Sequence, residues 1–198
     1  LSGKLFIVQA RPETIHSRKK DNSLSEYIID DTNGSTIRLT GIAVGDKIGQ
    51  GKIQKMYSLD GRDGSFDGSD FQQGDVLITE MTDPDWEPIM KMASAIITNK
   101  GGRTCHAAIV AREMGVPAIV GTENGTEVLF NGEEITVSCA EGDEGRVYDG
   151  IVPFKLKKTK LDKLPTTKTP IMLNVASPDL AFKFAQIPNA GVGLAREE

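Results

Sequence analysis

The sequence is poor in cysteine and has no long apolar run, and each shortage excludes a class of protein. Its 198 residues include only two cysteines, Cys105 and Cys139. Two thiols are too few for a disulfide framework or a cysteine-built zinc site, and they are typical of a reducing compartment. No apolar run approaches the roughly 18 residues of a membrane-spanning helix, and the first residues lack a basic region followed by an apolar one. We therefore expect a soluble, cytoplasmic protein with no membrane partner and no metal site in this chain.

The chain also has fewer basic residues than acidic ones. The chain has 23 Lys and Arg residues against 28 Asp and Glu residues, which gives a formal net charge of −5. A protein that binds nucleic acid or an anionic membrane surface needs a clearly basic face to do so. We therefore expect no nucleic-acid partner.

The stretch from Lys100 to Thr122 shows a clear order of elements. A run typical of a β-strand, Ala95–Thr98, stops at two glycines, and a helix is predicted from about Cys105 to Met114. Thr104 is placed to cap the start of this helix, while Gly115, followed by a proline two residues later, is placed to end it. The predicted unit is strand, turn, helix and strand.

His106 falls in the first turn of the predicted helix. The first N–H groups of a helix have no partner within the helix and carry the positive end of its dipole, so an anion binds well there. Gly101 and Gly102 have no side chains to keep a phosphate away from the backbone. A histidine, with a reference pKa of about 6.5, offers a neutral nitrogen nucleophile near neutral pH. The pattern favours phosphorylation of His106 itself, and the alternative is an ordinary polar residue at a helix start.

The segment GGRTCHAAIVARE resembles the active-site signature of the phosphoenolpyruvate-utilising enzymes, and Met81–Thr122 closely resembles the pyruvate, water dikinases of that family. The resemblance implies that His106 accepts a phosphoryl group from ATP and passes it to pyruvate. It also implies a phosphate pocket formed by the residues just before the histidine: Gly101, Gly102, Arg103 and Thr104. Thr104 matches a regulatory phosphorylation site of this family, which implies a regulatory kinase or phosphorylase as a partner.

Both ends of the chain resemble pieces of neighbouring domains in the same family. Leu5–Val8 is a strand-like run followed by Gln9 and Arg11. This pattern resembles the end of an ATP-grasp domain and implies that both side chains contact the nucleotide. Ile171–Val175 and the residues after it resemble the opening of the TIM-type barrel that binds phosphoenolpyruvate and pyruvate. The resemblance implies that Arg196 binds the substrate phosphate there.

Repeated short strands around one or two helices predict a small α/β domain. The resemblance identifies this domain, at residues 36–152, with the swivelling β/β/α phosphohistidine domain. Residues 1–35 are expected to hold the end of the ATP-binding domain and a linker, and residues 153–170 a second, lysine-rich linker that charge repulsion keeps extended. Residues 171–198 are expected to start the barrel. The chain is therefore expected to be the middle of a longer enzyme and to be inactive alone.

For the longer enzyme the resemblance implies a complete reaction, in which ATP, pyruvate and water give AMP, phosphoenolpyruvate and phosphate. Mg²⁺ is expected outside this chain, ATP and pyruvate bind through the flanking domains, and the enzyme is expected to be a homo-oligomer. Two alternatives stay open. One is the equivalent domain of a pyruvate, phosphate dikinase or of a sugar phosphotransferase component. The other is a β-rich interaction domain without enzymatic role, whose histidine only begins a helix.

Overall fold

The structure is a computed structural model that describes residues 23–30, 35–59, 71–160, 167–175, 185 and 187–195. Contacts between residues divide the chain into two units. The larger unit contains Tyr27–Lys155, and the smaller one contains residues 23–26 together with the described residues from 156 onward. His106 therefore lies in the larger unit.

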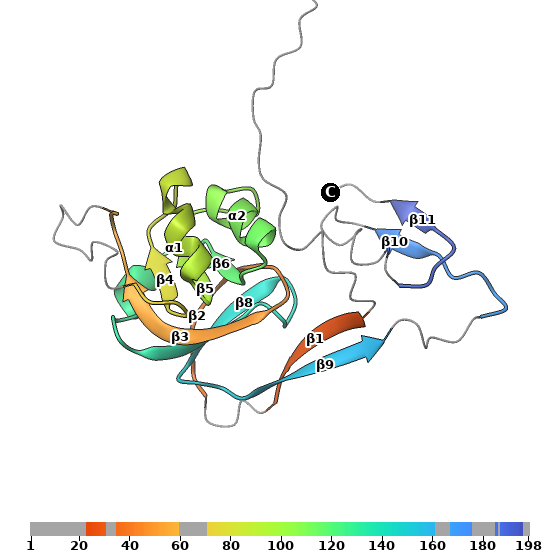
Figure 1. The fold of residues 1–198 in the computed structure, drawn as a ribbon, viewed down its shortest axis with the longest axis horizontal. Coiled ribbons are helices and arrows are strands. Elements are labelled where there is room, and N and C mark those ends of the chain that lie inside the picture. The colour runs from red at the N-terminus through yellow and green to blue at the C-terminus, as the bar shows by residue number, and fades with distance from the viewer. Residues whose placement is uncertain are drawn as a thin grey trace, which may run out of the picture. The chain divides into compact units, whose positions relative to one another are not determined.

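A closed β-barrel of seven strands forms the centre of the larger unit (Figure 1). Around the barrel the strands follow the order β2, β6, β5, β4, β3, β7 and β8. The run β3, β4, β5 and β6 is parallel, and the remaining neighbours are antiparallel. The bounds of the strands are β2 Ile37–Val44, β3 Ile48–Lys55, β4 Val76–Thr79, β5 Ala95–Thr98, β6 Ala118–Val120, β7 Glu134–Ser138 and β8 Glu144–Asp149. With the helices, this confirms the mixed α/β class expected from the sequence.

Two of the helices, α1 and α2, lie together on one side of the parallel strands (Figure 1). The helical segments of the larger unit are η2 Pro84–Trp86, α1 Glu87–Met92, α2 His106–Met114 and α3 Gly125–Val128. The Asp83 carboxylate begins η2 by accepting a hydrogen bond from the Asp85 N–H at 3.0 Å. Within the described part of the chain, no helix is long and apolar enough to cross a membrane.

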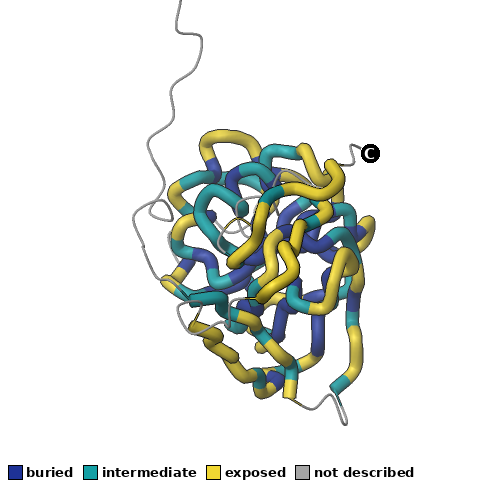
Figure 2. The backbone as a smooth tube through the Cα atoms, turned by 90° about the vertical axis from the view of Figure 1, so that its right-hand side faces the viewer, coloured by how far each residue is buried: buried dark blue, intermediate teal, exposed yellow. Residues whose placement is uncertain are grey.

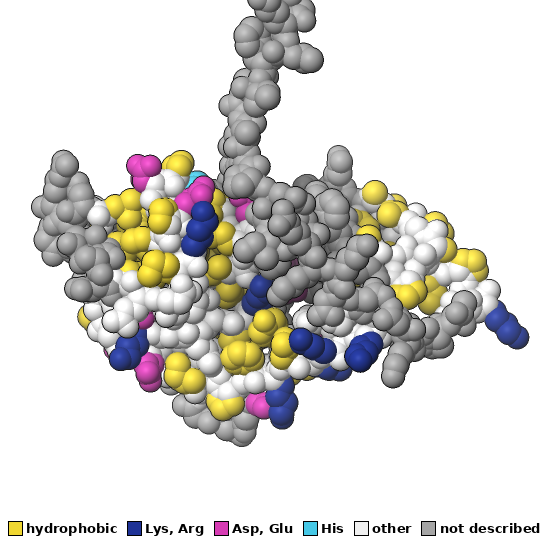
Figure 3. Space-filling model, viewed as in Figure 1, with side chains coloured by type: hydrophobic (Ala, Val, Ile, Leu, Met, Phe, Trp, Pro, Cys, Tyr) yellow, Lys and Arg dark blue, Asp and Glu magenta, His cyan; other side chains and the backbone are white. Residues whose placement is uncertain are grey.

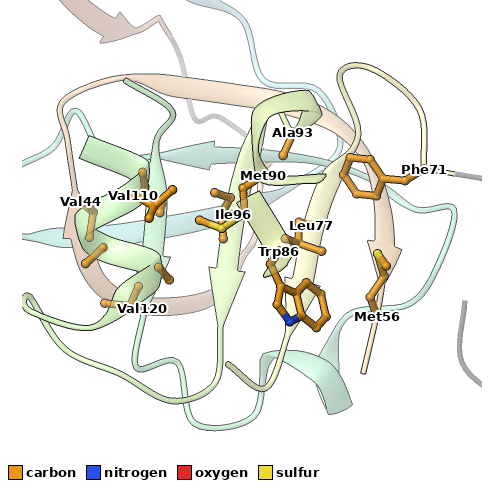
Figure 4. Packing of buried hydrophobic residues seen from close by; sticks show 14 residues of the cluster. Val44, Met56, Phe71, Leu77, Trp86, Met90, Ala93, Ile96, Val110 and Val120 are labelled. Atoms are coloured by element: carbon orange, nitrogen blue, oxygen red, sulfur yellow. The ribbon is translucent and has the colours of Figure 1, made fainter. Parts of the chain in front are cut away.

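The parallel strands are buried on both faces, because successive side chains of a strand point in opposite directions. On β4, Val76 and Ile78 join an apolar cluster contributed by all the barrel strands, whereas Leu77 joins the cluster that includes the helices. On β5, Ile97 joins the first of these clusters and Ile96 joins the second. Figure 2 marks the buried residues in dark blue, and Figure 4 shows the helix-side cluster with Trp86, Met90, Val110 and Val120 labelled. Burying each large apolar side chain contributes about 1.5–3 kcal/mol, so two apolar layers hold these strands in place.

The C-terminal end of α2 is fixed by Gly115 and Lys47. Gly115 has a φ of 66°, a left-handed conformation that glycine adopts at low cost. The Lys47 Nζ donates a hydrogen bond to the Gly115 carbonyl at 2.6 Å. This contact places a positive charge at the negative end of the helix dipole. The predicted end of the helix is thus confirmed.

The two segments that were predicted as linkers contain strands that pair with each other. β1 (Ser23–Ile29) and β9 (Phe154–Lys160) form a two-stranded sheet. The Lys155 Nζ lies 2.6 Å from the Asp30 carboxylate, and a second lysine of β9 pairs with a glutamate of β1 in the same way. The prediction for residues 153–170 considered only repulsion among the lysines of one segment. In the structure the two strands are paired, and acidic residues of the other segment lie beside two of these lysines.

Two short strands of the smaller unit run parallel to each other. They are β10 (Leu173–Val175) and β11 (Val192–Ala195). Parallel strands need a crossover connection, as in the opening of a parallel barrel. Most of the chain between these two strands, residues 176–184 and 186, lies outside the described residues. The assignment of residues 171–198 to a barrel therefore stays a prediction.

The two cysteines are expected to differ strongly in reactivity, because the thiolate and not the thiol reacts. Burial raises the pKa of the Cys139 thiol to about 12, whereas Cys105 is partly exposed. A chromogenic disulfide reagent at about pH 8 should therefore titrate Cys105 in the folded protein and Cys139 only after unfolding in urea. In a Cys105→Ala variant no thiol should react before unfolding, and rapid reaction of Cys139 in that folded variant would contradict its burial.

Candidate functional site

The carboxyl ends of the parallel strands meet at one edge of the barrel. Thr79 at the end of β4 pairs in register with Thr98 at the end of β5, and β6 is the next strand along. The loops that follow β4 and β5 therefore begin side by side. α2 starts after the second of these loops, with His106 as its first residue. Ligands of α/β sheets characteristically bind beyond the carboxyl ends of parallel strands.

A pocket of about 280 Å³ lies at this edge. Its lining residues come from the loop after β4, the loop after β5 and the start of α2: Met81, Thr82, Lys100, Gly101, Cys105, His106 and Ala107. His106 is half-buried and lines this pocket. Figure 3 shows a histidine at the molecular surface beside acidic and basic side chains.

One hydrogen bond orients the imidazole ring of His106. Its Nδ1 lies 3.0 Å from Oγ1 of Thr82, a residue that is only 6% exposed. In the tautomer that carries its proton on Nδ1, this nitrogen donates to the hydroxyl oxygen and Nε2 keeps its lone pair. A neutral ring in this state presents Nε2 as a nucleophile.

The prediction that Thr104 caps α2 is wrong. The N-cap residue is Cys105, which has extended backbone angles and makes no side-chain cap hydrogen bond. The reason is a turn before the helix, in which the Cys105 N–H donates to the Gly102 carbonyl at 3.1 Å and which leaves Thr104 exposed. Because the cap side chain satisfies none of the first helical N–H groups, the positive end of the helix stays available to an anion.

The two glycines before the helix have different structural roles. Gly101 has a φ of 118°, and a Cβ at this position would lie 2.7 Å from the Sγ of Cys105. A Cβ at Gly102 would meet no atom within 4 Å. The backbone therefore requires glycine at position 101, whereas position 102 faces open space.

Two basic residues flank the glycines, and neither is held tightly. The Nζ of Lys100 is 3.4 Å from the Glu80 carboxylate, and the Nη2 of Arg103 is 3.3 Å from the Asp143 carboxylate. The side chains of Lys100 and Arg103 are both more than half exposed. Exposed ion pairs of this kind contribute about 0–1 kcal/mol. Either cation can therefore exchange its carboxylate for a phosphate at little cost.

Only some of the residues predicted to bind phosphate line the observed pocket. His106 and Gly101 line the pocket, and the other predicted members belong to the turn just before the helix: Gly102, Arg103 and Thr104. Sequence analysis missed Thr82 and Lys100, which also line it. Their contribution depends on the parallel pairing of β4 with β5, and no local pattern shows that pairing. The signal in the sequence is that Lys100 follows the predicted strand Ala95–Thr98, and Thr82 follows the apolar run Val76–Ile78, each within a few residues.

The other predicted site residues lie at the two ends of the chain. Gln9, Arg11 and Arg196 are outside the described residues, so their roles stay predictions. Among the described residues there is no group of three or more His, Cys, Asp or Glu that could hold a metal ion.

A comparison with protein families matches the part of the chain that contains the pocket. Residues 71–142 match the family described as the mobile domain of phosphoenolpyruvate-utilising enzymes. The matched segment includes β4, β5, both lining loops and His106. The predicted resemblance to phosphoenolpyruvate-utilising enzymes is therefore confirmed over residues 71–142, which match this mobile domain.

The chain as a whole is similar to a segment of longer proteins. It is 53% identical over 198 residues to a phosphoenolpyruvate synthase of Aquifex aeolicus, covering 98% of this chain and 22% of that protein. It is 53% identical over 197 residues to the phosphoenolpyruvate synthase of a Synechocystis species, with 100% and 23% coverage. For the phosphoenolpyruvate synthase of Escherichia coli the identity is 50% over 197 residues, with 100% and 24% coverage. The chain thus spans about a quarter of the length of the curated relatives it matches.

Alanine should destabilise the protein at Gly101 but not at Gly102. Gly101→Ala is expected to lower the free energy of unfolding by about 1–3 kcal/mol, because its Cβ would meet Cys105 in a strained backbone conformation. Gly102→Ala is the matched control and should change it by less than about 0.5 kcal/mol. Urea denaturation followed by the fluorescence of Trp86, the only tryptophan, measures both values. Equal losses in the two variants would contradict the described turn.

Proposed function

We propose that this chain is the phosphoryl-carrier segment of a phosphoenolpyruvate synthase, a pyruvate, water dikinase. The observation that carries the proposal is the position of His106. This residue begins α2 and lines a pocket, and its ring contacts Thr82. The family match of residues 71–142 and the similarity to phosphoenolpyruvate synthases support it. The longer enzyme then converts ATP, pyruvate and water into AMP, phosphoenolpyruvate and phosphate.

His106 takes part in both halves of this reaction. First, the lone pair of Nε2 attacks a phosphorus atom of ATP, so that a P–N bond forms and a phosphoanhydride bond breaks. Water hydrolyses the second anhydride bond, and AMP and phosphate leave. Later, pyruvate loses a methyl proton, its enolate oxygen attacks the same phosphorus atom, and the P–N bond breaks. Nε2 recovers its lone pair, and phosphoenolpyruvate is the product.

The surroundings of His106 stabilise the phosphorylated ring in two ways. A ring that carries a phosphoryl group on Nε2 and a proton on Nδ1 is positively charged, so its hydrogen bond to Thr82 becomes charge-assisted and stronger. The free N–H groups at the start of α2 favour the negative charge of the phosphoryl group. Lys100 at the pocket wall and Arg103 in the adjacent turn add positive charge.

The flanking parts of the chain extend the proposal. ATP binds in an ATP-grasp domain that ends near Gln9 and Arg11, and pyruvate binds in a TIM-type barrel that begins at residues 171–198 and includes Arg196. Mg²⁺ is bound in those domains, outside the described residues. The enzyme acts in the cytoplasm as a homo-oligomer, without a nucleic-acid partner. Similarity to phosphoenolpyruvate synthases along the whole chain supports this arrangement.

Transfer to His106 is tested in the full-length protein with radiolabelled ATP. The label should be acid-labile and alkali-stable, and it should map to the peptide that contains His106. His106→Ala should abolish it, because no other group in the pocket is an imidazole. His16→Ala is the matched control, since His16 is the other histidine of the chain, and it should keep the label. Full activity of the His106→Ala enzyme would contradict the carrier role and favour an interaction domain.

The acceptor of the second phosphoryl group of ATP distinguishes the proposed enzyme from a pyruvate, phosphate dikinase. We expect AMP formation in the presence of pyruvate to proceed in buffer without added phosphate, with water as the acceptor. A strict requirement for inorganic phosphate would contradict the assignment to a synthase but keep the carrier role of His106.

A phosphate on Thr104 is expected to inhibit the enzyme. Thr104 is exposed and lies two residues before His106, so it is accessible to a regulatory kinase or phosphorylase. A phosphothreonine adds a charge of about −1.5 to −2, which repels an incoming phosphoryl donor at the same helix end. Thr104→Glu should therefore reduce labelling of His106 by about tenfold or more, while Thr104→Ala should keep it, because Thr104 makes no cap hydrogen bond. Equal labelling in both variants would contradict inhibition by charge.

A further inference from the structure

Three polar side chains meet next to the loops that form the pocket. Glu80 follows β4, Asn99 follows β5 and Thr126 lies in α3. Asn99 and Thr126 are 5% and 4% exposed, whereas the Glu80 side chain is 40% exposed. None of the three lines the pocket. We call them the polar triad.

The polar triad forms a closed set of hydrogen bonds. The Nδ2 of Asn99 donates to Oε1 of Glu80 at 2.5 Å and to Oγ1 of Thr126 at 2.6 Å. The Thr126 hydroxyl donates to the same Glu80 oxygen at 3.1 Å, and the Thr126 N–H donates to Oδ1 of Asn99 at 3.0 Å. Both amide donors of Asn99 and its carbonyl oxygen are thus used, so the side chain has one favourable orientation. Asn99 and Thr126, the two buried members, have these polar groups satisfied, and such a network is rigid.

The chain brings α3 unusually close to the loop after β5 in order to make these bonds. A Cβ at Gly125 would lie 2.8 Å from Oγ1 of Thr122 and 3.2 Å from Oδ1 of Asn99. Glycine at this position therefore lets the next residue, Thr126, reach Asn99. The charge on Glu80 strengthens the contact, because hydrogen bonds to an ionised carboxylate are about twice as strong as neutral ones.

The polar triad is connected directly to both walls of the pocket. The Lys100 N–H donates to the Glu80 carbonyl at 2.9 Å and holds the loops after β4 and β5 together. Two residues after Glu80 comes Thr82, which bonds the histidine ring. Two residues after Asn99 comes Gly101, which lines the pocket. A change in the triad therefore moves the hydrogen-bond partner of the ring and the glycine turn together.

We propose that Glu80, Asn99 and Thr126 are positioning residues for phosphoryl transfer. They fix the two loops so that Thr82 holds Nδ1 of His106 and Nε2 stays free for the phosphoryl group. They act through Thr82 and do not touch the phosphoryl group themselves. This inference rests on the proposed carrier function.

The tautomer of His106 reports on this role independently of activity. In the chain labelled with ¹⁵N-histidine, the ring nitrogen shifts at high pH should show one tautomer, protonated on Nδ1. Thr126→Val removes the hydroxyl while keeping the shape, and it should give a mixture of the two tautomers. Thr126→Ser restores the hydroxyl and should restore the single tautomer. A His16→Ala background assigns the signals, because it leaves one histidine in the chain.

Thr136→Val is the matched control for loss of a buried hydroxyl. Thr136 lies on β7, away from the pocket loops, and is 0% exposed. Its Oγ1 forms hydrogen bonds with the Gln50 side chain, the Gly150 carbonyl and the Val152 N–H. This variant should lose stability but keep the single tautomer. A tautomer shift in Thr136→Val as large as that in Thr126→Val would overturn the proposal, because general destabilisation would then explain both.

The rate of labelling gives the second readout, in the full-length enzyme. Thr126→Val should label His106 on the order of tenfold more slowly or worse, because small misplacements of a reacting group cost about this much. Glu80→Gln keeps the shape at a partly exposed position and should fold, and it should slow labelling in the same direction. Wild-type tautomer and rates within about twofold in both variants would overturn the positioning role. Absence of label in the wild-type protein would instead contradict the carrier function, while the tautomer measurement still tests the triad.

Discussion

The parallel pairing of β4 with β5 is the constraint on which the site depends. The pairing places Thr79 opposite Thr98, so the loops that follow start side by side at one edge of the barrel. One loop supplies Thr82, and the other runs through Gly101 into α2. Two apolar layers, one made by the barrel strands and one beneath the helices, fix the strands and therefore this edge. A shift of the register by one residue would turn every side chain to the opposite face.

Three separate features then meet at His106. The helix supplies a positive N-terminal end, Thr82 supplies a partner for Nδ1, and Gly101 supplies a turn that a side chain would block. None of them is strong alone, since a helix end contributes about 0.3–1 kcal/mol and a neutral hydrogen bond about 1 kcal/mol. Together they leave one ring nitrogen free beside an anion-binding backbone. Under the proposed carrier role, this arrangement stores a phosphoryl group while the reactions that load and unload it occur in other domains.

Much of this could be predicted from the sequence, because local patterns decide it. The strand at Ala95–Thr98, the helix that starts with His106 and its end at Gly115 follow from apolar periodicity and glycine placement. The cap was predicted wrongly, because Thr104 has the right side chain and the turn closed by Gly102 places Cys105 at the cap instead. The pairing of β1 with β9 and the role of Thr82 were missed for a common reason. Both depend on contacts between segments far apart in the chain, and no local pattern specifies those contacts.

The proposed carrier role requires a bond between phosphorus and Nε2 of His106. The most direct measurement is the ³¹P–¹⁵N coupling in the phosphorylated full-length protein, prepared with ¹⁵N-histidine and kept at alkaline pH. The carrier role predicts coupling to Nε2 of His106 alone, because Nδ1 faces Thr82. Coupling to Nδ1, or phosphate found only on Thr104, would contradict it.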